Sequence, residues 1–162
     1  MRSALLLVLL VLLVTLMFTD ASFPCQRSWN NNAYDQFKYR HILSSSFNTK
    51  SRRAWAEYLT TNRLCGRAPR QSFLNKNYKE SIRNICNGEG VKDRDNLCTS
   101  IRKFTVYIVQ SSLSNGQCEV QVQSVRSYVV VACEVIGNQC LPVHYGTQTN
   151  WRPDQNGQIC RP

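Results

Sequence analysis

Hydrophobic residues in the first part of the chain recur at the spacing of an α-helix. In the stretch 34–42, four side chains fall near one face, at i, i+3, i+7 and i+8: Tyr34, Phe37, His41 and Ile42. Similar spacing predicts two further helices, over 52–59 and 77–86. Three helices are therefore expected before the chain changes character.

The second part of the chain alternates hydrophobic and polar residues or carries β-branched runs, as strands do. Strands are predicted over four stretches: 104–110, 118–124, 128–134 and 141–145. Turn residues at 114–116 and 137–138 separate neighbouring strands. Pro142 indicates an edge strand or a strand start, because proline has no amide hydrogen for the ladder. Helices followed by antiparallel strands predict an α+β fold.

The first residues have the pattern of a secretory signal peptide. A positive start at Met1-Arg2 precedes an almost uninterrupted apolar run over 4–18, and small residues follow. This predicts a signal peptide over 1–21 and a single domain over 22–162. The apolar run is short for a membrane span, and the chain has no second one.

All eight cysteines lie after the predicted signal peptide. An even number in a small secreted chain predicts disulfides, although eight cysteines allow 105 pairings. Their spacing does not predict a zinc site, because the chain has no Cys-x-x-Cys motif and only two histidines.

The formal net charge is +10. Such an excess attracts nucleic acids, sulfated glycans or anionic membrane surfaces, and does not choose among them. The helical part carries a candidate phosphate-binding surface, although for any single residue a solvated basic face is the favoured interpretation. The surface consists of Arg52, Arg53, Arg63, Arg67, Arg70, Lys76, Lys79 and Arg83.

The two histidines, His41 and His144, both fall in predicted regular structure. Histidine titrates near neutral pH and can carry protons. Taken alone, each also fits a plainer interpretation. His41 would then be a core histidine bonded to a backbone carbonyl, and His144 a surface residue without a role.

Two motifs connect these histidines to a known family. The motif VACE at 131–134, a turn, and the motif LPVHY at 141–145 resemble the C-terminal signature of the pancreatic-type ribonucleases, most closely their angiogenin-like branch. That family has its other catalytic histidine on an N-terminal helix, four residues after a buried phenylalanine. Phe37 and His41 match this spacing. Both histidines stand where the family needs them, which favours an active-site pair.

The resemblance implies a disulfide-stapled α+β fold, in which three helices of the N-terminal half pack on a V-shaped antiparallel sheet. It also implies a secreted, monomeric endoribonuclease that cleaves single-stranded RNA 3′ of pyrimidines through a 2′,3′-cyclic phosphate. His41 would take the ribose 2′-hydroxyl proton, His144 would protonate the leaving 5′-oxygen, and a cation would stabilise the phosphoryl oxygens. RNA would be the partner, and neither a metal, a cofactor nor a stable protein partner is expected.

The lysine that supplies this cation in the family is missing. The family has it directly after the cysteine that Cys65 matches, but here Gly66 follows and two extra residues precede 71–73. Arg67 or Arg70 would replace it, and Arg67 is preferred because it is nearer the cysteine. Arginine binds phosphate through two nitrogens but is not equivalent to lysine, so weak activity is expected.

The resemblance implies five substrate contacts: Ser72, Tyr145, Arg40, Asn96 and Glu134. Ser72 replaces a threonine and offers the same hydroxyl to a pyrimidine edge. Tyr145 replaces a phenylalanine beside the first base, and Arg40 a glutamine that contacts phosphate. Gly146 stands where the family usually has an aspartate that orients the acid histidine.

The resemblance also implies two disulfides, Cys65–Cys118 and Cys86–Cys133. The turn before His144 is longer than in the family and contains an extra cysteine. The remaining pairs are inferred from family loops and from the two mature ends: Cys98–Cys140 and Cys25–Cys160.

Two other functions remain open. The altered lysine and aspartate positions fit a non-catalytic basic protein of the same fold, which acts in host defence on glycans or microbial membranes. An angiogenin-like growth signal with slight nuclease activity is the third interpretation.

Overall fold

The computed structural model describes residues 25–161, so the predicted signal peptide over 1–21 lies outside the described part. None of the helices in this part is both long enough and apolar enough to span a bilayer.

The three predicted helices are present. Helix α2 spans Ala33–His41, α3 spans Arg52–Thr61, and α4 spans Lys79–Asn84 after a 3-10 turn, η1, at Lys76–Tyr78. Helix α3 begins where Ser51 caps it, because the Ser51 hydroxyl accepts a hydrogen bond from the amide of Ala54 at 3.2 Å.

Seven strands form one sheet around β6. They are β1 (Gln26–Arg27), β2 (Gln71–Leu74), β3 (Gly90–Lys92), β4 (Leu97–Ser100), β5 (Phe104–Ser114), β6 (Gln117–Ile136) and β7 (Gln139–Thr149). Their order is β2-β5-β6-β4-β3, with β1 and β7 also paired to β6. All pairs are antiparallel except the two-residue β1 with β6. The expected α+β fold is confirmed.

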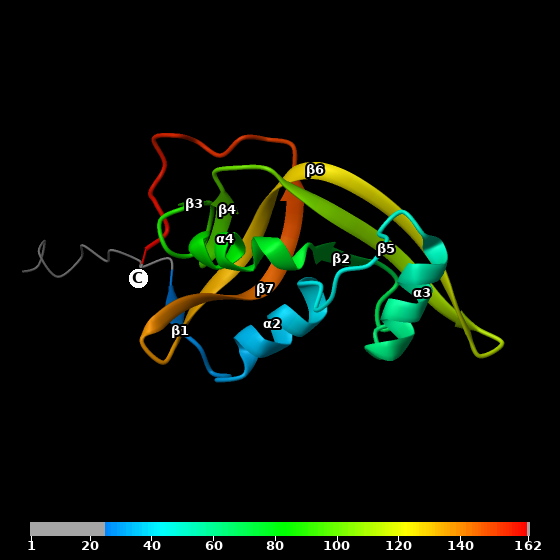
Figure 1. Ribbon diagram of the computed structural model, residues 1–162. Helices are drawn as coiled ribbons and strands as arrows, with labels where there is room; N and C mark the ends of the chain where they lie inside the picture. Colours follow the sequence, from blue (N-terminus) through cyan, green and yellow to red (C-terminus); the bar gives the residue numbers. More distant parts are fainter. Residues whose placement is uncertain (1–24, 162) are drawn as a thin grey trace, which may run out of the picture.

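Strand β6 is the backbone of the sheet. The sequence pattern predicted two strands over 118–124 and 128–134, but β6 runs through both as one strand of 20 residues. Its first part pairs with β5 and its second part with β7 and β4. Because β6 bends between these parts, the sheet has two arms (Figure 1). Strand β7 pairs only with β6, so Pro142 lies in an edge strand as expected.

The helices cover different parts of this bent sheet. Helix α2 contacts β7 and β2, and α3 contacts β6 (Figure 1). The core has two clusters. The larger joins Phe37 of α2 to Ile82 of α4 and Val131 of β6. The smaller packs Trp55 of α3 on Phe73 of β2. Burial of such side chains is the main stabilising contribution to a domain of this size.

Four disulfides staple the fold. Cys65–Cys118 and Cys86–Cys133 are present, as the resemblance implied. The other two predicted pairs are wrong, because the structure joins Cys25 to Cys140 and Cys98 to Cys160.

Strand pairing explains the corrected disulfides. β1 and β7 both pair with the same end of β6, which brings Cys25 and Cys140 together. The C-terminal segment instead bonds to β3, where the Cys160 amide donates to the Gly90 carbonyl at 2.8 Å. Because β3 pairs with β4, Cys160 meets Cys98.

Candidate active site

His41 is the last residue of α2 and its ring orientation is fixed by β2. Its Nδ1 lies 2.9 Å from the backbone oxygen of Ser72. A carbonyl only accepts hydrogen bonds, so Nδ1 carries the hydrogen and the Nε2 lone pair remains available. His41 therefore forms the hydrogen bond to a backbone carbonyl that the plainer interpretation required. The same hydrogen bond leaves Nε2 free to accept a proton.

Burial lowers the pKa of His41 to about 4. The hydrogen bond to Ser72 acts in the opposite direction, whereas the charges of Arg67, His144 and Arg40 lower this pKa further. His41 is consequently neutral at neutral pH.

Tyr145 forms the wall against which His41 packs. The two rings are stacked, with centroids 5.2 Å apart and an interplanar angle of 23°. Burial raises the pKa of Tyr145, so its hydroxyl stays protonated. That hydroxyl donates to Oε1 of Gln148 at 2.8 Å.

Gln148 is a residue that the sequence analysis missed. Its Oε1 also accepts a hydrogen bond from the Ser72 hydroxyl at 3.3 Å, so one amide oxygen holds two hydroxyls at the edge of the site. The sequence contains no clear signal for it, because the residues that continue the strand after Tyr145, Gly-Thr-Gln-Thr, do not alternate between apolar and polar.

Two bulges in β7 flank His144 and Tyr145. His144 pairs with Ala132, and Tyr145 with Val131, but Val143 and Gly146 have no partner on β6. Bulges re-aim side chains beside many active sites. His144 is exposed, while Tyr145 is only 8% exposed.

A cleft of about 500 Å³ opens beside His41. It is lined by His41, Arg67, Arg70, Gln71, Ser72, Tyr145, Gly146, Thr147 and Gln148. His144 is not among the lining residues, although its neighbours are. The cleft has the size of an ordinary small-molecule site. Among its lining residues, Arg67 and Arg70 are cationic, His41 becomes cationic when protonated, and none is acidic.

Arg67 is held at this cleft by a buried amide. Its Nε donates to Oε1 of Gln71 at 3.0 Å. Gln71 is 2% exposed and its own Nε2 donates to the Leu64 carbonyl at 2.8 Å. Because Nε is occupied, the two terminal nitrogens of the guanidinium remain available for an anion. Partial burial and the nearby charge of Arg40 lower the pKa of Arg67.

Gly66 lies against β5 and does not line the cleft. Its amide donates to the Ser111 hydroxyl at 3.1 Å, and a Cβ at this position would be nearest to the Leu113 amide nitrogen at 3.6 Å. Its φ of +66° is also unfavourable for a lysine. Gly66, which the resemblance matched to the family's lysine, therefore lies outside the residues that line the cleft.

The remaining predicted contacts lie at two places. Arg40 is exposed on α2 directly before His41, and its charge acts on both His41 and Arg67. Asn96 and Glu134 lie on the second arm, where the Asn96 carbonyl accepts from the amide of Cys133, the residue before Glu134, at 2.9 Å. Leu97 and His144 flank Ala132 on either side of β6. Asn96 and Glu134 thus lie on the same arm of the sheet as His144.

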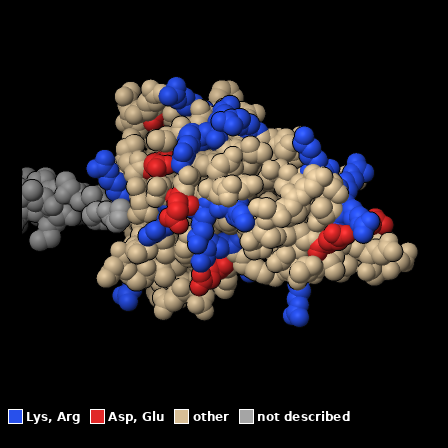
Figure 2. Space-filling model, viewed as in Figure 1, with Lys and Arg blue, Asp and Glu red and all other residues tan. Residues whose placement is uncertain are grey.

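The cations of the predicted phosphate-binding surface line different depressions, with Arg67 and Arg70 at the cleft and Arg52 at a neighbouring depression. Figure 2 shows basic side chains distributed over the viewed face with acidic ones among them. Arg53 is paired with Glu57 at 2.9 Å and Arg83 with Glu80 at 3.4 Å. The lysines at 76 and 79 line a separate depression beside α2.

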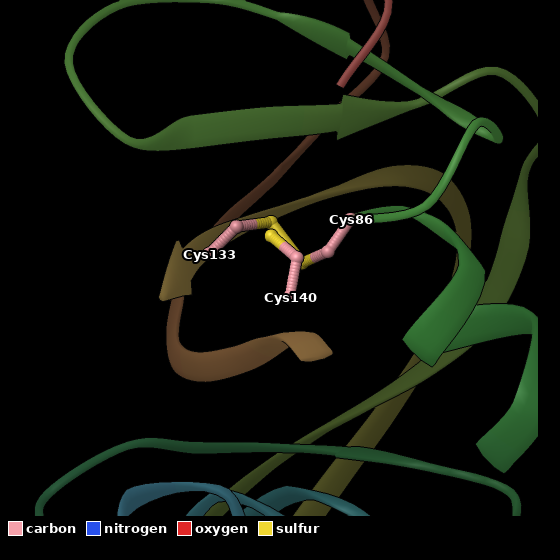
Figure 3. A group of neighbouring side chains, drawn as sticks. All are labelled: Cys86, Cys133 and Cys140. Carbon is pink, nitrogen blue, oxygen red and sulfur yellow. A yellow bond between two sulfur atoms is a disulfide. The ribbon is translucent and has the colours of Figure 1, made fainter. Parts of the chain in front are cut away.

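Three cysteine sulfurs gather in the core, all within 4.8 Å of one another. They belong to Cys86, Cys133 and Cys140, and Figure 3 shows the sulfur of Cys140 beside the Cys86–Cys133 bond. Since Cys140 is bonded to Cys25, none of the three offers the thiolate that a metal ion needs.

Comparison with known proteins identifies the fold by structure. No protein-family model and no curated protein matches this chain in sequence. Among solved structures, green turtle egg-white ribonuclease is similar with a TM-score of 0.57 and 20% identity, over 72% of this chain and 98% of that one. A structure described as SS-RNase-2 des116-120 is similar with a TM-score of 0.56 and 23% identity, over 73% of this chain and 99% of the other.

Proposed function

Because the chain has the ribonuclease A-like fold, we propose that it is a secreted, metal-independent endoribonuclease that cleaves single-stranded RNA 3′ of pyrimidines through a 2′,3′-cyclic phosphate. The observation that carries this proposal is the state of His41. Its Nδ1 is committed to the Ser72 carbonyl, its pKa is lowered to about 4, and it lines a cleft that contains two arginines.

His41 serves as the general base. Nε2 takes the proton of the ribose 2′-hydroxyl, and the 2′-oxygen attacks phosphorus. His144 then protonates the 5′-oxygen as the bond from phosphorus to that oxygen breaks. Both proton carriers belong to the chain, so the reaction requires no metal ion.

Arg67 stabilises the charge that develops on the phosphoryl oxygens, because its terminal nitrogens remain free beside His41. Arg40 adds positive charge from the adjacent helix position. Ser72 meets the Watson–Crick edge of a pyrimidine, and Tyr145 supports the base, as in the sequence-based prediction. Asn96 and Glu134, on the same arm of the sheet as His144, contact the following base.

The test is cleavage of an oligonucleotide that has one uridine ribonucleotide in a DNA backbone, in the presence of EDTA. Wild-type protein is expected to cleave only after the uridine and to yield a 2′,3′-cyclic phosphate. The variants His41→Gln and His144→Gln, and the double variant purified in parallel, are expected to lose this activity. Equal cleavage by the double variant would show that the activity comes from a contaminating enzyme.

A second candidate is a non-catalytic basic protein of the same fold that binds anionic glycans or membranes. Two features favour this candidate: His144 is exposed, and Gly146 offers no carboxylate that could orient the acid histidine. An inactive wild-type protein that binds heparin or anionic vesicles as tightly as the double histidine variant would support it.

The extracellular location accords with four disulfides, which persist in oxidising compartments. An angiogenin-like signalling role would require the same cleavage activity at a low level, so the same assay bears on it.

A further inference from the structure

The first part of β6 has a free backbone edge. Over 117–127 this strand pairs with β5 on one side, whereas β7 and β4 pair with β6 only from Tyr128 onward. Within the described residues, no further group is hydrogen-bonded to the backbone of this stretch. Figure 1 shows it as the outer strand of the β5–β6 arm. Because successive backbone groups of a strand point to alternate sides, about half of those over 117–127 lack a protein partner.

The other edges of the sheet are covered or irregular. The segment after α2 lies along β2, where the Leu43 amide donates to the Leu74 carbonyl at 2.9 Å. The C-terminal segment bonds to β3 in the same way. Strand β7 contains Pro142 and two bulges, which hinder pairing with another chain. By contrast, β6 over 117–127 keeps an unbroken register with β5 and contains neither proline nor glycine.

The hairpin that carries this free edge lacks basic residues. No lysine or arginine occurs between Lys103 and Arg126, although the chain has 20 of them, and Glu119 is the only acid there. The tip of the arm is mostly tan in Figure 2. Two copies of a chain with a formal net charge of +10 repel each other, so an arm without basic residues is a favourable place for them to meet. Arg52 and Arg70 border the arm from other segments, so some repulsion remains.

We propose that this chain forms a homodimer in which the free edges of β6, over 117–126, pair antiparallel across a two-fold axis and join the two sheets. An axis perpendicular to the sheet sets residues of the same face opposite each other, because side chains alternate with a period of two. Any such axis between Val120 and Ser124 places Glu119 opposite an uncharged residue, so no like charges face each other.

Both faces of the edge complement themselves across this axis. On one face, Val120 and Val122 are half-buried against the cluster that contains Trp55, and a second copy would extend this apolar contact. On the other face, Gln121 and Gln123 are exposed, and neither side chain has a hydrogen-bond partner in the described part of the chain. Amides both donate and accept, so these glutamines can bond to each other across the axis. A second copy therefore fits this edge better than a strand of unrelated sequence.

The dimer is expected to be weak. Two paired strands bury less than the roughly 1,600 Å² of a standard interface, so half-dimerisation is expected at a protein concentration on the order of 10–100 µM. Salt screens the repulsion between the two copies and should strengthen the dimer. Nucleic-acid binding responds to salt in the opposite direction, so the two associations are distinguishable.

Sedimentation velocity of wild-type protein over a series of concentrations, at low and at physiological salt, measures the dimerisation. Gln121→Lys places a cation close to its counterpart across the axis and should weaken the dimer by about tenfold. Asn138→Lys adds the same charge at the exposed turn between β6 and β7, far along the same strand, and should change it by less than about twofold. Thermal unfolding of both variants shows that each is folded.

Amide hydrogen exchange locates the contact. At concentrations that favour the dimer, alternate amides within 117–126 should exchange more slowly, and those of β7 should be unchanged. A protein that remains monomeric up to about 1 mM, as the resemblance implied, overturns the proposal. Equal weakening by Gln121→Lys and Asn138→Lys, or protection along β7 in place of 117–126, overturns it too. None of these measurements involves RNA, so failure of the dimer leaves the catalytic proposal standing.

Discussion

The state of a single ring decides how this site would work. His41 is neutral because burial outweighs its hydrogen bond to Ser72, and the neighbouring arginines, Arg67 and Arg40, add to the effect. A neutral imidazole with one nitrogen already committed is a preorganised base. Its low pKa also has a cost, because a weaker base removes a proton less readily.

The titration of His41 is therefore expected to have its midpoint near pH 4 rather than near 6.5. Its charged form is disfavoured, so the acid limb of kcat/KM should fall only as the pH drops through about 4. Arg67→Ala should raise the midpoint, because it removes a positive charge that opposes protonation. NMR titration of the ring protons checks both statements, and a wild-type midpoint close to 6.5 would contradict them.

Arg67 is expected to matter more than Arg70. Arg67 is held by Gln71 beside His41, so Arg67→Ala should lower kcat/KM by about 10²–10³, the usual effect of losing one transition-state donor. Arg70→Ala should act mainly on KM. Arg126→Ala, which removes an exposed charge elsewhere, is the control for net charge, and similar losses in all three variants would exclude a specific role.

Restoring the family's lysine should not rescue activity. The sequence favoured Gly66→Lys only on the condition that the local backbone is like that of the family. Because residue 66 has a φ of +66° and lies against β5, the substitution should destabilise the fold by about 1–2 kcal/mol without raising turnover. Thermal unfolding and the cleavage assay measure the two effects separately.

At the scale of elements, β7 supplies more of the site than any other segment. Its two bulges flank His144 and Tyr145, which pair regularly with Ala132 and Val131, and its end carries Gln148. An edge strand can accept such bulges, because its outer side has no partner to lose.

Gln148 is expected to set a preference between pyrimidines. Its Oε1 takes the Ser72 hydroxyl hydrogen, so Ser72 presents a lone pair, which suits the N3–H of uracil and not the bare N3 of cytosine. Gln148→Ala should narrow the ratio of uridine to cytidine cleavage by about fivefold, the value of one neutral hydrogen bond near 1 kcal/mol. The kcat/KM values for paired dinucleotide substrates measure this ratio, and an unchanged ratio would remove Gln148 from base selection.

At the scale of the whole molecule, two of the disulfides join the chain ends to the sheet. Cys25–Cys140 spans 115 residues and Cys98–Cys160 spans 62. They tie β1 and the C-terminal segment to the second arm of the sheet, near the region of Asn96 and Glu134.

Replacing Cys25 and Cys140 together by serine is expected to lower the free energy of unfolding by about 4–5 kcal/mol, because the unfolded chain regains the entropy of a long open loop. Urea unfolding measures the loss. A peptide map of non-reduced wild-type protein should contain the Cys25–Cys140 and Cys98–Cys160 fragments, and fragments joining Cys25 to Cys160 would contradict the structure.

Salt dependence reports on the basic surface as a whole. If Arg52, Arg67 and Arg70 each neutralise one phosphate, log affinity for a six-nucleotide strand should fall against log salt concentration with a slope of about −2. Fluorescence titration between low and physiological salt provides the slope. A value near zero would mean that the formal charge of +10 does not act on nucleic acid here.

The sequence by itself determined the three helices, the longer strands and the α+β class, because each depends on local periodicity that burial imposes on neighbouring residues. The short strands β2, β3 and β4 were not predicted. Each has only three or four residues, so its extended form depends on a partner distant in the chain.

Only the tertiary structure decided the terminal disulfides and the surroundings of His41. The entropy of closing a loop changes slowly with its length, so it cannot choose between Cys140 and Cys160 as the partner of Cys25. Strand pairing makes that choice. Likewise, the family motifs indicated His41 and Ser72, and Arg67 was inferred as the replacement for the missing lysine. The contact of Arg67 with Gln71 was not predicted, nor were those of His41 with Ser72 and of Ser72 with Gln148. Such contacts join residues far apart in the chain, and no local pattern encodes them.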